Sequence, residues 1–181
     1  MIYPTFRDIF KSSLQDACYD YKYNMSKDVE QYLIRLCADD LLKTSASRPD
    51  GMVDSLIIFD ALPNTKEATE YLKLNGDYYL TVAGYMPEAF CNKHTDFDYY
   101  LSVGKYSYYR LHQRISKDAL FKTLSFDYMQ IIFILNATFD SIKVSSDGDM
   151  IKAWECWKQT SHPIFRRKLV RMGLDTKESS D

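Results

Sequence analysis

The sequence predicts an all-α protein, an irregular bundle of about seven or eight helices, and three observations lead to this fold class. Apolar residues recur at intervals of three and four along most of the 181 residues, which is the spacing of a helix face packed on a core. No segment shows a convincing alternation of apolar and polar residues, as a half-buried strand would. The chain also contains only six glycines and five prolines, too few for the many tight turns of a sandwich or barrel.

The N-terminal part of the chain predicts two helices and a loop. Thr5 can cap the first helix, and a second is expected over residues 27–43, each with apolar residues at helical spacing. Residues 44–51 form the clearest loop in the sequence, because they are rich in residues that favour turns. This loop divides an expected N-terminal hairpin, 5–43, from a main bundle, 52–173.

The middle of the chain predicts three further helices. Residues 53–62 are apolar and end at a proline; we favour a helix over a strand here, because no strand partner is evident. Thr65 then caps a long helix that reaches about Tyr85, since Pro87 cannot continue it. The next helix is expected over residues 96–115.

The C-terminal third predicts three helices and a short tail. The first opens at Ser116 or Lys117 and continues through an apolar stretch to Ile142. The most apolar run of the chain, Met129 to Leu135, lies within it and is too short to span a bilayer. A turn at 145–149 precedes the second, which contains both tryptophans.

The last predicted helix is basic. It begins at His162-Pro163 and ends at Gly173, a residue type common just after helix ends. Residues 1–173 are therefore expected to form a single helical domain, followed by a flexible polar tail at 174–181.

Charge and cysteine content limit the classes of partner and the compartment. The formal net charge of −2 provides no field that would attract nucleic acid or an anionic membrane. The N-terminus has no basic start and no apolar run, so it does not resemble a signal peptide. Four scattered cysteines are typical of a reducing compartment, which predicts a cytoplasmic protein. Export as an effector stays open, because such substrates need no N-terminal signal peptide.

Glycines within the predicted helices indicate either a tight helix crossing or a pocket. A glycine inside a helix costs about 1 kcal/mol relative to alanine, so Gly76 and Gly84 call for a reason. Close approach of the next helix is one reason, with Gly104 as the opposing notch. The alternative is a pocket, in which Asp77 and Glu88 would supply the polar groups.

No catalytic residue and no cofactor is predicted. The chain lacks a Glu-x-x-His pair on a helix, a Gly-x-Ser-x-Gly turn and a glycine-rich phosphate loop. Cys91 and His94 have the spacing of half a metal site, and Asp96 and Asp98 follow closely. Because no second pair lies nearby, these four residues are weak metal candidates and no metal is predicted.

Two segments are candidates for a partner surface. Tyrosine is unusually frequent in this chain, with fifteen residues. Tyr106, Tyr109 and Arg110 mix aromatic rings with a cation, as surfaces that stack on a partner do. Arg166 and Arg167 lie on the basic C-terminal helix, which could meet an acidic partner. For the first segment the alternative is that the tyrosines face the core and the cations are solvated. For the basic helix the alternative is a face that is only solvated.

A partial resemblance to a known family covers about forty residues. The two runs Gly76-Asp77-x-x-Leu80-x-x-x-Gly84-x-x-Pro87-Glu88 and Asp98-Tyr99-Tyr100-x-x-x-Gly104-x-x-x-Tyr108-x-x-Leu111 carry it. They resemble a small all-helical family of proteobacterial proteins, which has no catalytic residues to transfer. That family commonly has phenylalanine and arginines around the Pro-Glu pair, whereas this chain has Met86, Ala89 and Phe90.

A second resemblance concerns composition. The chain is rich in tyrosine, lysine and aspartate and poor in glycine, and in this it is similar to the transmission trait enhancer proteins of intracellular bacteria. That resemblance implies a regulator that promotes virulence or transmission traits.

These observations favour a non-enzymatic regulatory or adaptor protein that acts through contacts with another protein. The alternative is a ligand- or metal-binding helical enzyme with a pocket between the helices at 65–86 and 96–115. A net charge of −2 argues against direct nucleic-acid binding. The sequence leaves the partner, the ligand and the oligomeric state open.

Overall fold

The computed structural model describes residues 4–40, 56–91, 97–115, 119–143 and 147–174, and within these ranges the chain is all-α. The predicted fold class is therefore confirmed. The elements are α1 (Phe6–Asp20), α2 (Lys27–Ile34), the π-helical η1 (Arg35–Asp40), α3 (Leu56–Ala61), α4 (Lys66–Tyr85), the 3-10 turn η2 (Pro87–Phe90), α5 (Phe97–Arg114), α6 (Ala119–Phe126), α7 (Tyr128–Ile142), α8 (Asp147–Thr160) and α9 (Pro163–Arg171). Within the described ranges, no helix has the length and apolar character needed to cross a membrane.

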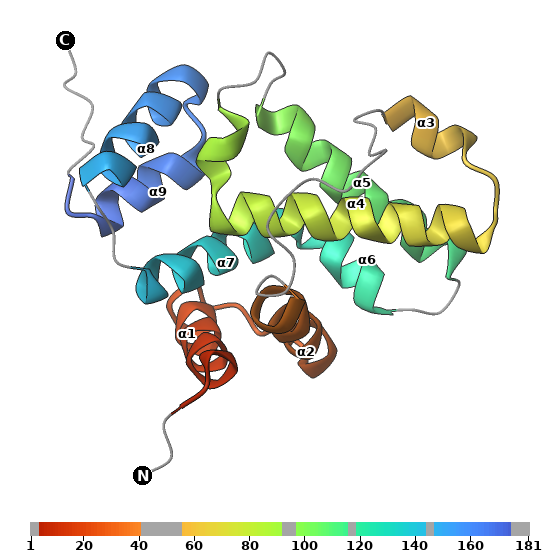
Figure 1. Cartoon of the computed structure of the whole chain (residues 1–181), viewed down its shortest axis with the longest axis horizontal. Helices are drawn as coiled ribbons and strands as arrows, with labels where there is room; N and C mark the ends of the chain where they lie inside the picture. Colours follow the sequence, from red (N-terminus) through yellow and green to blue (C-terminus); the bar gives the residue numbers. More distant parts are fainter. Residues whose placement is uncertain (1–3, 41–55, 92–96, 116–118, 144–146, 175–181) are drawn as a thin grey trace.

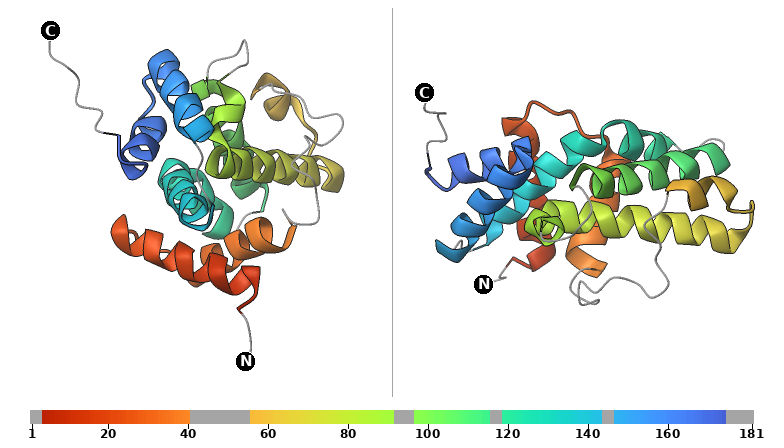
Figure 2. Two further views of the ribbon diagram at one scale, coloured as in Figure 1. Left: turned by 60° about the vertical axis from the view of Figure 1, so that its left-hand side comes forward. Right: turned by 90° about the horizontal axis from the view of Figure 1, so that it is seen from above.

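Helix α4 is the central element of the bundle (Figure 1). It packs most extensively against α5 and next against α7. Helices α1 and α2 lie below α7 and α4 in this view, while α8 and α9 form a pair at one end of the molecule and α3 lies at the other. Two further views show the same arrangement, with α8 and α9 side by side (Figure 2).

Side-chain caps begin the helices where the sequence places them. Thr5 and Asp8 form a reciprocal capping box at the start of α1, with the backbone N–H of Thr5 donating to the Asp8 carboxylate at 2.9 Å. Thr65 caps α4 by accepting from the backbone N–H of Ala68 at 3.2 Å. At the other end of the chain, Gly173 has a φ of +87°, the left-handed conformation that ends a helix at low cost. The predictions at Thr5, Thr65 and Gly173 are thus confirmed.

Aromatic side chains fill much of the core. The largest fully buried ones come from six different helices and from η2: Tyr79, Tyr108, Tyr128, Phe10, Phe59, Phe90 and Phe165. Complete burial of one such ring removes enough apolar surface from water to contribute about 1.5–3 kcal/mol. The tyrosine hydroxyls give this core a polar component. The Tyr108 hydroxyl donates to Asp77, whereas the buried Tyr128 hydroxyl has no hydrogen-bond partner among the described residues.

Three element boundaries differ from the prediction. The single helix expected from 116 or 117 to 142 is divided into α6 and α7 at Asp127, whose carboxylate accepts a hydrogen bond from the Tyr23 hydroxyl at 2.6 Å. The division lets α6 pack on α5 and α7 pack on α1 and α4. The second predicted helix changes from α to π geometry at Arg35, and α8 already begins at Asp147, inside the predicted turn.

The N-terminal hairpin and the segment after the loop are also refined by the structure. α1 packs mainly on α7 and only slightly on α2, so the two helices do not form a self-contained hairpin. The described part of the apolar segment at 53–62 is helical, as favoured, over Leu56–Ala61. The predicted loop at 44–51 and the tail beyond residue 174 lie outside the described residues.

Candidate functional site

Asp77 lies in the interior between α2, α4 and α5. The hydroxyls of Tyr32 and Tyr108 both donate to Oδ1 of Asp77, at 2.5 and 2.8 Å. Lys73, one turn earlier on α4, forms an ion pair with Oδ2. The carboxylate is therefore satisfied from three sides, as a buried charge must be.

The tyrosines around Asp77 hold their protons firmly. Burial, followed by the negative charge of Asp77, raises the pKa of Tyr32 and of Tyr108 well above the ordinary value of 10.0. The same two causes raise the pKa of Tyr128, which lies on α7 beside Tyr108. None of these groups is tuned towards neutral pH, so the cluster is suited to holding helices together rather than to proton transfer.

Gly76 of α4 and Gly104 of α5 lie where the two helices cross. A Cβ on Gly76 would lie 2.7 Å from the ring of Tyr108 on α5. A Cβ on Gly104 would lie 2.7 Å from the Cβ of Tyr79 on α4 and 2.0 Å from the hydroxyl oxygen of Tyr128. Each glycine thus admits a tyrosine of another helix, and the space between α4 and α5 around them is filled by side chains.

Gly84 serves a different contact, between α4 and α7. A Cβ there would lie 2.7 Å from the Cβ of Leu135, and the Gly84 carbonyl accepts a hydrogen bond from the Asn136 side chain at 3.3 Å. Of the five residues predicted for a crossing or pocket, Gly76, Asp77 and Gly104 lie together, while Gly84 and Glu88 lie further along towards α7 and α9.

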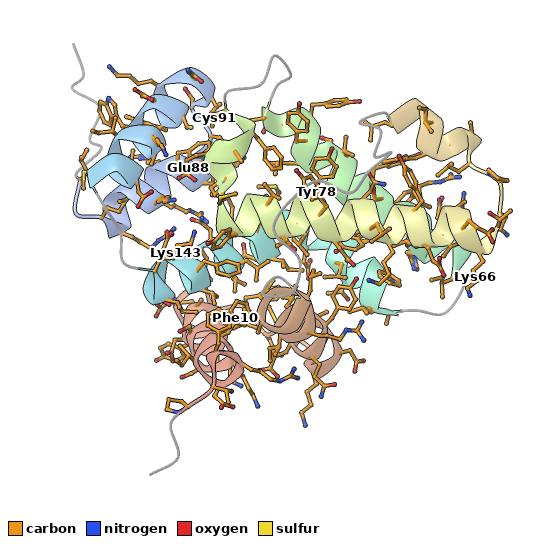
Figure 3. The ribbon with its side chains drawn as sticks, in the orientation of Figure 1. Phe10, Lys66, Tyr78, Glu88, Cys91 and Lys143 are labelled. Carbon is orange, nitrogen blue, oxygen red and sulfur yellow. The ribbon has the colours of Figure 1, made fainter. Side chains whose placement is uncertain are left out.

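Glu88 belongs to a polar corner at the opposite end of α4 from Lys66 (Figure 3). Lys168 of α9, with a side chain only 7% exposed, donates to Oε1 of Glu88 at 2.5 Å. Lys168 also lies 3.9 Å from Asp140, which accepts from Arg171 at 2.6 Å. The acid and base side chains are paired with one another, which offsets the cost of removing them from water.

A pocket of about 430 Å³ opens beside this corner. Its walls come from η2, α7, α8 and α9 and include Glu88, Lys143, Cys156 and Lys168. Burial, and then the charge of Lys168, lowers the pKa of Lys143, whose ammonium donates to the Tyr85 carbonyl at 2.5 Å. With acids and bases in similar number, the pocket has no strong preference for anions or cations.

The metal candidates are only partly described. Cys91 follows η2 and lies beside Cys156 of α8, while Asp98 at the start of α5 lies 3.6 Å from Nε2 of His162. His94 and Asp96 lie outside the described residues. Among the residues that the structure describes, no three His, Cys, Asp or Glu side chains are grouped in a way that could hold a metal ion.

The predicted aromatic-cationic surface borders an apolar groove between α5, α6 and α3. The rings of Tyr106 and Tyr109 stack with centroids 5.8 Å apart. Phe126, at the end of α6, is 65% exposed. The groove, of about 420 Å³, is lined by Leu56, Ser102, Lys105, Tyr106, Tyr109, Ser125 and Phe126. We call it the α5–α6 groove.

Asp60 of α3 engages two of the three residues predicted for this surface. It accepts a hydrogen bond from the Tyr106 hydroxyl at 2.5 Å and lies 3.3 Å from the guanidinium of Arg110. Tyr106 and Arg110 therefore hold α3 on α5, while Tyr109 is left with an exposed ring.

Arg166 and Arg167 are exposed on α9, away from the α5–α6 groove. The Arg167 guanidinium lies 4.1 Å from the centre of the Phe133 ring and 5.5 Å from that of Tyr21. Arg167 thus covers aromatic surface of α7 and α1, in the manner of a cation–π contact.

Several residues of these sites were not singled out in the sequence. Phe126 lies on the face of α6 that points away from the buried Phe121 and Leu124, so helical spacing within α6 could have marked it as exposed. Lys168 is buried although it stands in a basic run with Arg166 and Arg167. A signal was present for Tyr32, because a tyrosine within a predicted apolar face needs a buried acceptor.

Comparisons with family models, with curated proteins and with solved structures found no match to this chain. The resemblances to the helical proteobacterial family and to transmission trait enhancers therefore stay predictions that rest on the residues and composition quoted above.

Proposed function

We propose that this chain is a non-enzymatic regulatory or adaptor protein that binds another protein through the α5–α6 groove. One observation carries the proposal: Phe126 is 65% exposed beside the stacked rings of Tyr106 and Tyr109, at the edge of a largely apolar groove. Exposed aromatic residues that surround a groove are typical anchors of protein interfaces.

The chemistry of the groove favours an amphipathic helix of the partner with acidic residues beside its apolar face. Lys105 lines the groove, and Lys122 lies one turn before Phe126 on the same side of α6. Neither lysine forms an ion pair with another described residue, so both are available to carboxylates of a partner. An apolar groove with cations at its edge accommodates such a helix by burying the apolar face.

The virulence or transmission role implied by the composition would be one use of such an adaptor. We keep this role as part of the proposal. Identification of the partner would show whether it belongs to a virulence or transmission pathway. The enzyme alternative placed a pocket between the helices at 65–86 and 96–115, but Tyr79 and Tyr108 occupy the crossing of α4 and α5. The filled crossing of α4 and α5 therefore supports an enzyme pocket less well than the α5–α6 groove supports protein binding.

The experiment is site-specific photo-crosslinking in the native host. A benzophenone amino acid replaces Phe126 in one variant and Tyr19 in a matched control, because Tyr19 is 85% exposed on α1, away from the groove. We expect one protein to be cross-linked at position 126 and not at 19, with the linked peptide predicted to be an acidic amphipathic helix. Equal labelling at both positions, or none at 126, would remove the groove as the binding site.

A pair of variants provides the second readout. Tyr109→Ser combined with Phe126→Ser should abolish capture of the same protein, whereas Tyr19→Ser should leave it unchanged. Tyr106 and Arg110 are left intact in this design, because both also contact Asp60 of α3. Retained capture by the double variant would contradict the proposal.

A further inference from the structure

Two of the four cysteines lie side by side at the polar corner, although 65 positions separate them in the sequence. Cys91 follows η2 directly and is half-buried, whereas Cys156 lies on α8 and is 5% exposed. A hydrogen bond between the two thiols is the first cause of the raised pKa of Cys91 and of the lowered pKa of Cys156. η2 and α8 pack against each other, and the two cysteines lie at this packing contact.

We propose that Cys91 and Cys156 form a reversible dithiol–disulfide pair that reacts with a small-molecule disulfide of the glutathione class. The oxidant would reach Cys156 through the pocket of about 430 Å³ beside Glu88, because Cys156 is one of the residues that line it. Figure 3 shows Glu88 and Cys91 on the same short segment, on the side of the molecule where α8 lies.

The surroundings assign different roles to the two sulfur atoms. The hydrogen bond between the two thiols lowers the pKa of Cys156, while the same hydrogen bond and burial raise the pKa of Cys91. Cys156 is thus the first thiolate and the attacking nucleophile. Cys91 keeps its proton until the second step and then acts as the resolving thiol.

The reaction balances in two exchange steps. The Cys156 thiolate attacks one sulfur of the small disulfide, which breaks its S–S bond, forms a mixed disulfide at Cys156 and releases one thiolate. Cys91 then loses its proton and attacks the sulfur of Cys156, which forms the Cys91–Cys156 bond and releases the second thiolate. The protein loses two electrons and two protons, and the small disulfide becomes two thiols.

The other two cysteines are suitable internal controls. Burial, and then the charge of Glu30, raises the pKa of Cys18 to about 11. Cys37 is completely buried, and burial followed by the charge of Asp77 raises its pKa well above the ordinary value. Neither of these cysteines has the activating hydrogen bond of Cys156, so both are expected to stay reduced.

The test equilibrates the purified full-length chain in glutathione buffers of increasing oxidised fraction, traps the remaining thiols under acid quench and maps the peptides. We expect the number of free thiols to fall from four to two, with a single linked pair of peptides that contains Cys91 and Cys156. Full reduction should restore four thiols. Linkage of any other two cysteines, or four free thiols in the most oxidising buffer, would overturn the proposal.

Single variants separate the two roles. Cys91→Ser should stop the reaction after the first step, leaving one glutathione on Cys156, and Cys156→Ser should leave Cys91 largely unmodified. Attachment of glutathione to Cys91 rather than Cys156 would contradict the assignment of the nucleophile. Since a variant could misfold, the far-UV circular dichroism of each is compared with that of the wild type, and the wild-type peptide map remains decisive by itself.

Discussion

Asp77 and Asp60 have similar partners in two very different regions of the molecule. Each accepts a hydrogen bond from a tyrosine hydroxyl on α5, Tyr108 for Asp77 and Tyr106 for Asp60, and each is paired with a cation. The Asp77 side chain is 10% exposed, however, whereas that of Asp60 is 59% exposed. The two carboxylates therefore differ mainly in their access to water.

This difference separates the part of the molecule that maintains the fold from the part that is available for binding. Around Asp77, hydrogen bonds replace water that cannot enter, so every missing partner has a large cost. Around Asp60, water competes for the same groups, and the pair contributes little free energy while it shapes one side of the α5–α6 groove. The same residue types thus serve a closed core and an open surface.

The largest expected effect is that of removing the buried carboxylate. Asp77→Ala should lower the free energy of unfolding by about 4 kcal/mol, because two buried hydroxyls lose their acceptor and Lys73 loses its partner. Urea denaturation measures the change. Asp60→Ala is the matched control and should cost less than about 1 kcal/mol. Similar losses in the two variants would refute the role assigned to burial.

Alkaline pH should weaken the interior by a comparable amount. The pKa values of Tyr32, Tyr108 and Tyr128 are all raised above 10.0 in the folded chain, so the unfolded chain releases these protons first. The stability they support is complete below pH 10 and is lost as the pH rises above it. These three groups together contribute about 4 kcal/mol per pH unit to the loss, and Tyr23, whose pKa is also raised by burial and by its hydrogen bond to Asp127, adds to it.

Denaturation curves between pH 9 and 11, followed by circular dichroism and tyrosinate absorbance, measure this loss. Tyr128→Phe should reduce the slope by about 1.4 kcal/mol per pH unit, which is the contribution of one tyrosine with a raised pKa. A slope that is unchanged in this variant would be inconsistent with buried tyrosines as its origin.

A smaller but clear effect is expected at the crossing of α4 and α5. In an open helix, Gly→Ala stabilises by about 1 kcal/mol. At Gly104 the new methyl group would overlap the Tyr128 hydroxyl and the Cβ of Tyr79, so Gly104→Ala should instead destabilise by about 3 kcal/mol. Thermal unfolding gives the sign directly. A stabilised variant would mean that the crossing is looser than the structure indicates.

The sequence predicted those features that depend on neighbouring residues. The caps at Thr5 and Thr65 and the helix end at Gly173 follow from side chains within a few positions, and all three are confirmed. Gly76 and Gly104 also indicated a close approach of helices. The tyrosines that pack against them, Tyr108, Tyr79 and Tyr128, could not be assigned to these glycines from the sequence.

What the sequence could not provide depends on contacts between distant residues. The break at Asp127 accompanies a hydrogen bond from Tyr23, 104 positions earlier, and the apolar spacing continues through it. Glu88 meets Lys168 at a separation of 80 positions, and nothing local distinguishes this buried lysine from the exposed arginines beside it. Such pairings arise from tertiary packing, which helical periodicity does not encode.

The smallest effect on stability is expected at the groove, where the effect on binding should be largest. Phe126→Ser removes a ring that is 65% exposed, so the free energy of unfolding should change by no more than about 0.5 kcal/mol. Phe90, fully buried, provides the opposite case: Phe90→Ala should cost about 3–5 kcal/mol. If Phe126→Ser proved as costly as the core variant, Phe126 would belong to the fold, and its exposure could not be explained by a partner. If the free energy of unfolding is almost unchanged, the fold does not depend on the Phe126 ring. The ring is then free to serve in binding a partner.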